Sequence, residues 1–559
     1  MFGFLKDKEK WSRIRNHEDY KVLRDKLELE YDSLCRDKEI PQLPFSAWFE
    51  TIKTGNRKKF EDLYFLRRKQ MSIYALMSLI YPENEEYILR LEDILCEICN
   101  EYSWCVPIHL PADRLNVREH IDLFAAETGL YLAEIKYIFN ERLNPLILER
   151  ITNELDIRII KAFKNKTFSF ERFKSNWAAV CGGAVGTVLL YENPDAYIEL
   201  KPRLENCMRN YLESIGEDGS VSEGMAYWNY GFGFYCIYND MLRRYTFNRI
   251  DYFKDEKVKK LAGFFSGICM SNGTVYSYSD SSQKLSFNIG TLYYLNERFG
   301  VNVPSIEYGD LDVWKFSWAI RSFLYYKKDA SGAEVKNGVS YYDSFQCYVK
   351  RNDKYAFAIK GGNNKEQHNH NDVGSFVIVA DNKQLLCDLG APIYTAHTLS
   401  VKAYDDVVQK ASYGHNVPII NGKGQGYGSE YFGILAISGD EILVDMKDAY
   451  LEKADKLLRK VVLKEDRIVL NDEYEGVENF SERFVSDIKP EVLEGSVRID
   501  CLRINFDKED YEIKTNEINT LYHSGEERVI YLMDFIPRKE LKKTEIIFEF
   551  DENTTRNGG

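Results

Sequence analysis

The pattern of apolar residues changes near residue 335, and this change constrains the fold more than any other feature of the chain. Before it, apolar residues recur every three or four positions, which is the spacing of amphipathic helices. Loops rich in Gly, Ser and Asp separate these stretches. The clearest of them cover residues 84–102, 120–139, 143–163 and 176–191. The first part of the chain is therefore predicted to be helical.

After the change, short runs rich in β-branched and aromatic residues alternate with turn signals. The runs lie at 344–351, 355–362, 375–390, 460–476 and 528–536. Helices followed by strands indicate separate all-α and all-β parts, and 559 residues exceed what one hydrophobic core usually serves. We expect a helical domain over 1–325, an antiparallel β-sandwich over 335–550, and a disordered tail at 551–559.

The charge balance and the termini exclude several kinds of partner. With 74 Lys and Arg against 88 Asp and Glu, the net charge is −14, which disfavours nucleic acid. The chain shows no membrane-spanning apolar run and no signal-peptide core, so we expect a cytoplasmic protein.

Its eleven cysteines, an odd number, are typical of reduced thiols. The 39 tyrosines suit a sugar partner, although most tyrosines in proteins border hydrophobic cores.

The segment "GGNNKEQHNHNDVGSF" (361–376) concentrates polar side chains directly before an apolar strand. It contains His368 and His370, which would face the same side of an extended chain. Asp388 follows at the end of the next predicted strand, and His415 lies in "YGHNVP". Two His and one Asp from this group are a plausible set of zinc ligands. A structural, hydrogen-bonded role remains open for each histidine.

Two further segments carry candidate functional groups. In "DGSVSEGMAYWNYGFGFY" (218–235), Tyr227 and Tyr230 are three residues apart and share one helical face. Aromatic core packing is the simpler interpretation of this pair. Asn176 begins the predicted helix in "SNWAAVCGG", where helix capping by Ser175 or Asn176 is the simpler role.

Several motifs together indicate a family. The chain resembles the heparinase II/III-like polysaccharide lyases from about residue 104 to 422. The matching motifs, in the family's order, are "HIDLFAAETG", "NWAAVCGGA", "DGSVSEGMAYWNYG", "YSDSS", "HNHNDVGSF", "LLCDLG" and "GHNVPIING". The resemblance implies an N-terminal incomplete (α/α) toroid and a C-terminal antiparallel β-sandwich. It also implies β-elimination on uronic-acid polysaccharides at a cleft between the two domains.

The resemblance also implies roles for individual residues. The family's catalytic tyrosine corresponds to Tyr227, with Tyr230 as runner-up, and its catalytic histidine to His368. The family's carboxylate-neutralising residue on the toroid corresponds to Asn176. In family members with a zinc site, a structural zinc ion would bind at the positions of His370, Asp388 and His415. The chain departs from the family at Trp177 and Trp228, where many members have histidine, so its acid and base groups narrow to tyrosine and His368.

Four residues are expected at the substrate without a catalytic step: Glu223, Trp228, Gln367 and Asp280. Glu223 could instead cap a helix, and Asp280 could stabilise a turn. The alternatives to a lyase are a uronate epimerase, a glycoside hydrolase using Glu223 and Asp280, or a non-catalytic sugar-binding protein. The expected partner is an anionic oligosaccharide, and neither its identity nor the oligomeric state follows from the sequence. His109 and His120 receive no role.

Overall fold

The computed structural model describes residues 2–111, 113 and 115–558, and its chain divides into two compact units. Unit 1 contains the chain up to Ile215 together with Tyr227–Ala262 and Ser286–Ala333. Unit 2 contains Gly216–Ala226, Gly263–Leu285 and the chain from Glu334 onward. The chain therefore passes from one unit to the other five times rather than once.

The sequence predicts that the segments 216–226 and 263–285 belong to the helical domain over 1–325, but in the structure they belong to unit 2. They belong to unit 2 because their polar groups bond within it. Tyr278 Oη donates to the carbonyl of Val221, and Gln384 Nε2 donates to the carbonyl of Val275. Local spacing of apolar residues predicts a helix or a loop, but it does not predict which core that element joins.

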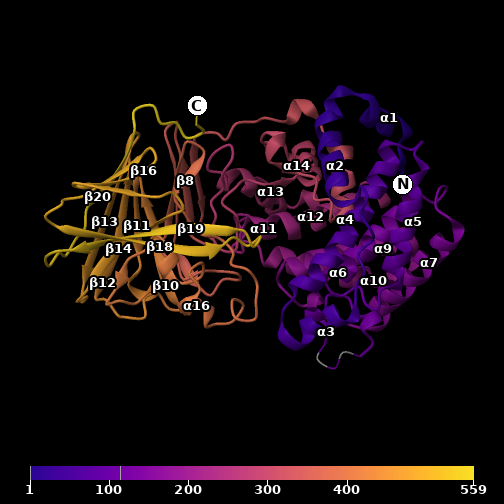
Figure 1. Ribbon diagram of the computed structural model, residues 1–559, viewed down its shortest axis with the longest axis horizontal. Helices are drawn as coiled ribbons and strands as arrows, with labels where there is room; N and C mark the ends of the chain where they lie inside the picture. The colour runs from indigo at the N-terminus through magenta and orange to yellow at the C-terminus, as the bar shows by residue number, and fades with distance from the viewer. Residues whose placement is uncertain (1, 112, 114, 559) are drawn as a thin grey trace. The chain divides into compact units, whose positions relative to one another are not determined.

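Most helices lie in unit 1 and are coloured indigo to magenta in Figure 1. Two of them, α11 and α13, continue across a boundary between the units. The α-helices of residues 8–325 are α1 (Lys8–Asn16), α2 (Lys21–Leu34), α3 (Phe45–Thr54), α4 (Lys58–Ile80), α5 (Glu85–Asn100), α6 (Leu123–Ile138), α7 (Pro145–Leu155), α8 (Ala162–Asn165), α9 (Asn176–Glu192), α10 (Pro194–Glu213), α11 (Met225–Tyr227), α12 (Gly233–Tyr245), α13 (Glu256–Ile268), α14 (Ile289–Phe299) and α15 (Phe316–Tyr325).

Shorter turns connect these helices. The π-helical segments are η5 (Asp156–Lys161) and η7 (Trp228–Phe232). The 3₁₀ turns of unit 1 are η1 (Gly3–Lys6), η2 (Glu18–Tyr20), η3 (Pro107–His109), η4 (Val117–Glu119), η6 (Ser169–Glu171), η8 (Tyr252–Lys254), η9 (Ile306–Tyr308) and η10 (Lys328–Ala330), whereas η11 (Ser412–Gly414) and η12 (Lys447–Ala449) lie in unit 2. A two-stranded parallel pair, β1 (Phe287–Asn288) with β2 (Gly309–Asp310), also lies in unit 1.

Helix α9 lies in the middle of this packing. All but three of its seventeen residues are buried, as its small apolar sequence predicts. A Cβ atom added at Gly182 would come within 2.5 Å of Cys207 Cβ on α10, and one at Gly186 within 2.6 Å of the Tyr238 ring on α12. Glycine therefore lets α9 approach both neighbouring helices closely.

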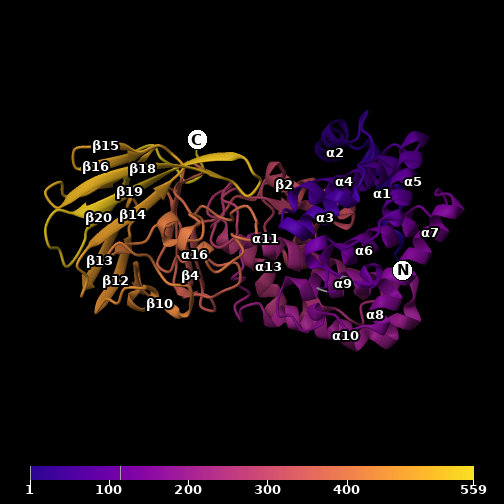
Figure 2. The same ribbon diagram turned by 60° about the horizontal axis from the view of Figure 1, so that its bottom comes forward.

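Unit 2 is built from antiparallel sheets, coloured orange to yellow in Figures 1 and 2. The chain also forms the short helix α16 (Ala403–Asp406) here. The strands are β3 (Gly338–Tyr342), β4 (Cys347–Arg351), β5 (Ala356–Lys360), β6 (Gly362–Asn364), β7 (Phe376–Ala380), β8 (Lys383–Leu386), β9 (Ile419–Ile420), β10 (Gly428–Ser438), β11 (Glu441–Asp445), β12 (Lys456–Leu463), β13 (Arg467–Glu475), β14 (Phe480–Ser486), β15 (Glu491–Leu493), β16 (Ser496–Ile499), β17 (Leu502–Asn505), β18 (Tyr511–Leu521), β19 (Glu527–Pro537) and β20 (Ile546–Phe550).

The strand order explains where the core lies. The nine-stranded sheet runs β15-β16-β17-β20-β13-β12-β11-β10-β6, the five-stranded sheet β3-β4-β5-β7-β8, and the four-stranded sheet β18-β19-β14-β9. Burial alternates strictly along β12, which buries one face, whereas β5 and β7 are buried throughout. Side chains from all three sheets, such as Phe376, Phe484 and Phe548, form one shared hydrophobic core.

The end of the chain is ordered as far as the structure describes it, unlike the predicted tail at 551–559. The carbonyl groups of Thr555 and Arg556 accept hydrogen bonds from the backbone of Asp381 and Asn382. The guanidinium of Arg556 is buried and donates to the carbonyl of Val335. The polar sequence suggested disorder, but these backbone bonds give the segment a fixed place. Among the described residues, no helix has both the length and the apolar character needed to cross a membrane.

Candidate functional site

The histidine-rich segment lies in the loop between β6 and β7, not in an extended strand. His368 has a left-handed backbone with φ of 56°, so the segment is bent at this residue and is not extended. The His368 ring is partly exposed, whereas His370 is fully buried. The alternation argument, which put both histidines on one face, therefore does not apply here.

Asp280 joins the two histidines through its two carboxylate oxygens. His368 Nδ1 lies 2.8 Å from Oδ2, and His370 Nε2 lies 3.2 Å from Oδ1. Tyr394 Oη donates to Oδ2 at 2.7 Å. Burial opposes the ionised form of Asp280, but hydrogen bonds from both histidines hold its pKa below the usual range. Asp280 therefore orients His368 and His370 and is not merely a turn residue.

Four buried residues form a cluster with metal-ligand chemistry: His370, Asp372, Asp388 and His415. One ligand atom from each lies within 4.8 Å of the others. His415 Nδ1 is 3.2 Å from Asp388 Oδ2, and His370 Nδ1 is 3.9 Å from Asp388 Oδ1. Asp372 was not among the predicted ligands, although it belongs to the same "HNHND" motif.

Three polar atoms of this cluster make no hydrogen bond within the described part of the chain. His370 Nδ1, His415 Nδ1 and Asp372 Oδ2 are buried without a hydrogen-bond partner among the described residues. The other ring nitrogen of each histidine is hydrogen-bonded. His370 Nε2 bonds to Asp280, and His415 Nε2 bonds to the carbonyl of Gln409 at 3.0 Å. Such outer contacts fix ring orientation in metal sites. Two imidazoles and two carboxylates fit a tetrahedral zinc ion.

The charges around the cluster balance in part. Lys360 Nζ donates to Asp372 Oδ1 at 2.7 Å. Burial acts to raise the pKa of Asp372, but the Lys360 charge outweighs it and lowers the value. Burial likewise opposes a charge on His415, yet the facing Asp388 carboxylate raises the pKa of its ring. The Asp372 carboxylate thus remains available as a ligand.

Buried polar groups hold the loops around the cluster. Arg459 on β12 donates to the carbonyls of Gly374 and Asn416 at 2.8 Å each, and it pairs with Asp472 and Glu482. The asparagines of the motif bond to backbone, as when Asn371 Nδ2 donates to the carbonyl of Gln425 at 3.0 Å. These contacts explain the polar composition of the segment: it fixes the loops around the cluster.

Glu223 lies in unit 2, near the His368 charge. The residue is buried, and its Oε2 has no hydrogen-bond partner among the described residues. Burial raises the pKa of Glu223 to about 7, while the His368 charge acts to lower it. Gln367 is exposed beside His368. Glu223 is thus a carboxylic acid that can exchange a proton near neutral pH.

The candidates on unit 1 lie where two helices begin. Asn176 is the buried first residue of α9, and Ser175 takes the N-cap position without a side-chain cap bond. Gly231 of η7 packs on Asn176, since an added Cβ would lie 3.0 Å from Asn176 Cβ. Tyr227, at the end of α11, is partly exposed. Unit 1 thus brings Asn176 and the tyrosine segment together, and π-helical turns such as η7 are frequent at functional sites.

Tyr230 and Trp228 have structural partners. Tyr230 Oη donates to Glu127, whose carboxylate also pairs with the buried Lys315 at 2.9 Å. Burial raises the pKa of Tyr230 well above its usual value. Trp228 is fully buried, with Nε1 donating to the carbonyl of Leu261 at 2.8 Å. Trp228 was predicted at a sugar subsite, and this prediction is wrong because the core encloses its ring.

Solved structures similar to this chain include lyases of heparan sulfate and of chondroitin. A heparinase III structure aligns with 100% of this chain and 92% of its own at 13% identity, with a TM-score of 0.64. A mutant of the heparan sulfate lyase HepC from Pedobacter heparinus aligns with 97% and 91% of the two chains at 12% identity and a TM-score of 0.62. The chondroitin AC lyase of Streptomyces coelicolor A3, in complex with chondroitin sulphate, aligns with 99% and 82% at 10% identity and 0.55.

At the level of sequence, no family model and no curated protein matches this chain. The structural likeness at 10–13% identity extends over almost the whole chain. It establishes the fold, which is the predicted one: an N-terminal incomplete (α/α) toroid followed by a C-terminal antiparallel β-sandwich.

Proposed function

We propose that this protein is a lyase that cleaves uronate-containing oligosaccharides by β-elimination. The observation that carries the proposal is the fold, which the chain shares over nearly its whole length with lyases of heparan sulfate and chondroitin. The arrangement of the predicted groups supports it. Asn176 adjoins the tyrosine segment in unit 1, and Asp280 orients His368 in unit 2. An anionic, glycosaminoglycan-like oligosaccharide is the proposed substrate.

The reaction needs three kinds of group. A base removes the proton from C5 of the uronate, the electron pair becomes the C4–C5 double bond, and the C4–O bond breaks as the leaving oxygen takes a proton. We assign both proton transfers to Tyr227, and each such transfer is typically worth about 10²–10⁴-fold. Asn176 and His368 stabilise the charge that develops on the carboxylate.

The choice of Tyr227 over Tyr230 rests on their surroundings. The Tyr230 hydroxyl is bonded to the buried Glu127–Lys315 pair, which leaves it poorly placed to exchange protons. Both tyrosines are partly exposed on this segment, so the contact with the Glu127–Lys315 pair is what distinguishes Tyr230. A tyrosine base also needs its pKa lowered by donors or cations, which a bound substrate complex would have to provide.

We further propose that His370, Asp372, Asp388 and His415 hold a structural zinc ion. A bound zinc ion would supply a fixed positive charge for the two carboxylates and connect three loops of unit 2. His370 also contacts Asp280, and so the same site would set the orientation of His368.

A glycoside hydrolase using Glu223 and Asp280 is the alternative that one observation favours. The surroundings push the two pKa values apart, upward for Glu223 and downward for Asp280, as acid and base roles require. Against it, both Asp280 oxygens already accept hydrogen bonds from His368, His370 and Tyr394.

The deciding experiment is a panel of uronate oligosaccharides, followed by the near-ultraviolet absorbance of the unsaturated product. We expect Tyr227→Phe to abolish the absorbance increase, and His368→Ala to reduce it by about 10²-fold or more. Tyr230→Phe is the matched control and should keep most of the activity. Cleavage without the absorbing product would replace the lyase with a hydrolase, and loss only in Tyr230→Phe would move the catalytic tyrosine.

A further inference from the structure

Unit 1 contains a second histidine–aspartate pair, made by residues 13 positions apart. His109 is the last residue of η3, and its Nδ1 lies 2.9 Å from Oδ2 of the fully buried Asp122. The carboxylate also accepts from the backbone amides of Ala125, at the start of α6, and Val106. Because the ionised carboxylate only accepts, His109 Nδ1 carries the hydrogen. In the neutral ring, Nε2 is then the acceptor, and in the charged ring it is a donor.

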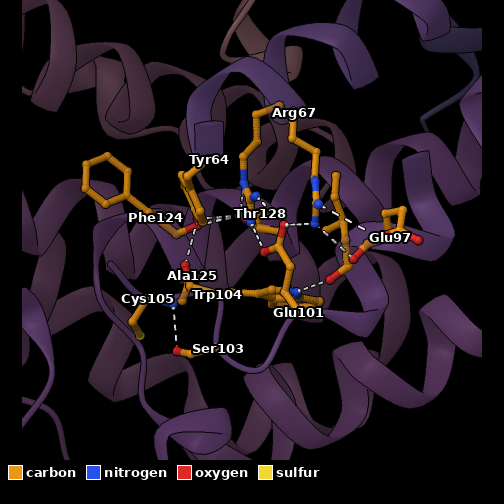
Figure 3. A network of polar contacts seen from close by, with 12 residues as sticks. Tyr64, Arg67, Glu97, Glu101, Ser103, Trp104, Cys105, Phe124, Ala125 and Thr128 are labelled. Atoms are coloured by element: carbon orange, nitrogen blue, oxygen red, sulfur yellow. Dashed lines mark hydrogen bonds and ion pairs between the residues drawn. The ribbon is translucent and has the colours of Figure 1, made fainter. Parts of the chain in front are cut away.

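The loop that carries His109 is held firmly, as Figure 3 shows. Glu101 pairs with Arg68 at 2.6 Å and with Arg67 at 3.0 Å, all three side chains being buried. Tyr64 Oη donates to the carbonyl of Trp104 at 2.7 Å. These contacts connect the loop to α4, and the Val106–Asp122 bond connects it to α6. His109 is therefore presented in one orientation, as groups at binding sites need to be.

His109 lies within a continuous series of aromatic side chains, which we call the aromatic row. Each ring contacts the next, with centroid separations of 5.5, 5.0, 5.7, 4.9 and 6.3 Å. All six side chains are partly exposed or exposed. In order, they are Trp314, Phe65, Phe124, His109, Trp177 and Phe173. Four of the contacts are edge-to-face, at interplanar angles of 63–84°, and only His109 and Phe124 are stacked. Partly exposed aromatic side chains of this kind suit contact with the C–H groups of sugar rings.

Polar and charged groups on or next to His109, Trp177 and Phe173 favour an anionic sugar. The His109 side chain is 17% exposed, and its Nε2 has no hydrogen-bond partner among the residues that the structure describes. Arg172 and Lys174 are exposed on either side of Phe173, and Lys174 is 3.1 Å from Glu213. Asn176, the proposed carboxylate-binding residue, directly precedes Trp177. A His109 ring that carries a second proton would offer Nε2–H as a donor to a sugar carboxylate.

We propose that His109 contacts the substrate and determines its specificity: its Nε2 bonds the acidic group of a sugar on the aromatic row, and Asp122 sets the ring orientation. The proposal deepens the lyase function and rests on it for the identity of the ligand. It also gives the chain a histidine beside Asn176, since the ring of His109 packs against Trp177.

The test measures binding to the full chain by calorimetry, separately from turnover. The ligands are a uronate oligosaccharide and its analogue with the carboxyl groups reduced to alcohols. His109→Asn keeps an amide for Asp122 but removes Nε2. We expect the dissociation constant for the acidic ligand to rise about 10- to 100-fold, with little change for the neutral one. Trp177→Ala should weaken both ligands alike, because it removes only the aromatic surface.

The matched control is His397→Asn. His397 Nε2 lies 2.8 Å from Asp406, so the residue types and the contact are the same, but both side chains are exposed on unit 2. This variant should bind both ligands as the unaltered chain does. Thermal unfolding of each variant checks that the fold is kept.

The outcomes separate the two proposals. If the acidic ligand binds, no unsaturated product forms, and His109→Asn loses the selectivity, then the lyase function fails and the His109 assignment stands. If product forms and His109→Asn keeps the selectivity and the Michaelis constant, the lyase function stands and the assignment is overturned. An equal loss for the acidic and the neutral ligand also overturns it, because a purely structural role predicts that result.

Discussion

Each unit presents one partly exposed histidine through a buried aspartate, yet the two pairs are built differently. In unit 2, the Asp280 carboxylate accepts hydrogen bonds from the side chains of His368, His370 and Tyr394. In unit 1, the Asp122 carboxylate accepts hydrogen bonds from the side chain of His109 and from two backbone amides. The first aspartate connects its histidine to a cluster of ligating residues, and the second connects it to the start of a helix. In the roles that we propose, the same kind of pair serves charge stabilisation in one unit and sugar binding in the other.

Buried arginines support both arrangements. Arg459 donates to the carbonyls of the loops that carry Asp372 and His415, and it pairs with two carboxylates. Arg68 pairs with Glu101 on the loop that carries His109. Glu101 has a second partner in Arg67, whereas Asp472 and Glu482 share Arg459. Loss of the single arginine in unit 2 should therefore destabilise the protein more than loss of one of the two arginines in unit 1.

The largest expected effect compares these two arginines. Arg459→Met leaves two buried carboxylates without a cation and should lower the free energy of unfolding by about 3–5 kcal/mol. Arg68→Met leaves Glu101 with Arg67 and should cost about 1–3 kcal/mol. Urea unfolding of both variants measures the difference. Equal losses would show that the second arginine in unit 1 gives no protection.

The second comparison concerns the two aspartates. Asp280→Asn removes the charge that faces His370, and it should weaken zinc binding by about 10–100-fold. Asp122→Asn, in the other unit, should leave zinc binding unchanged. Metal content after dialysis against zinc buffers of known free concentration gives both values. Zinc binding that is unaffected by Asp280→Asn would refute the link between Asp280 and the metal cluster.

The third comparison concerns buried carboxylates. In unit 1, Glu127 and Glu134 pair with Lys315 and Arg321, whereas Glu223 in unit 2 has an unpartnered oxygen. Burial raises the pKa of Glu223 from 4.5 to about 7, so the folded chain binds that proton more tightly than the unfolded chain. The contribution of Glu223 to stability should therefore fall as pH rises from about 4.5 to 7, by roughly 3 kcal/mol in total.

Glu223→Gln tests this because its amide stays neutral at every pH. The variant should match the wild type at low pH and exceed it by an amount that grows through this window. Unfolding in urea at several pH values measures the difference, and the exposed Glu494→Gln serves as the control. Parallel stability curves for Glu223→Gln and the wild type would contradict the raised pKa.

The smallest expected effect tests one contact of Asp280. Tyr394→Phe removes a single hydrogen bond to a charged group and should lower kcat/KM about 10-fold without unfolding the chain. Tyr341→Phe is the matched control, since its hydroxyl donates to Asp343 at 3.0 Å on the surface. An unchanged kcat/KM in Tyr394→Phe would mean that the histidines alone set the position of Asp280.

Much of the fold could be predicted because periodicity is a local property. The stretches at 84–102 and 176–191 are α5 and α9, and the run at 460–476 contains β13 and the end of β12. The passage of 216–226 and 263–285 into unit 2 could not be predicted, since it depends on contacts such as Tyr278 with Val221. Spacing along the chain carries no information about such contacts.

The candidate site also contains residues that the sequence could indicate and residues that it could not. "HNHND" is dense enough to predict a polar centre, and Asp372 could have been included from its place in the motif. His109 and Asp122 form no such cluster in the sequence, so nothing marked their contact. Trp228 was misjudged because its motif is aromatic throughout, and only the fold separates the buried rings from the exposed ones.

The repeated passage of the chain between the two units has a consequence for synthesis on the ribosome. Asp280 is made 88 residues before His368, its partner in unit 2. At about 5–20 residues per second, this carboxylate waits for roughly ten seconds before the β6–β7 loop exists. Unit 1 is also incomplete until residue 333 has been made, although its first 215 residues come early. Neither unit corresponds to a single contiguous stretch that could be synthesised, or excised, as an independent piece.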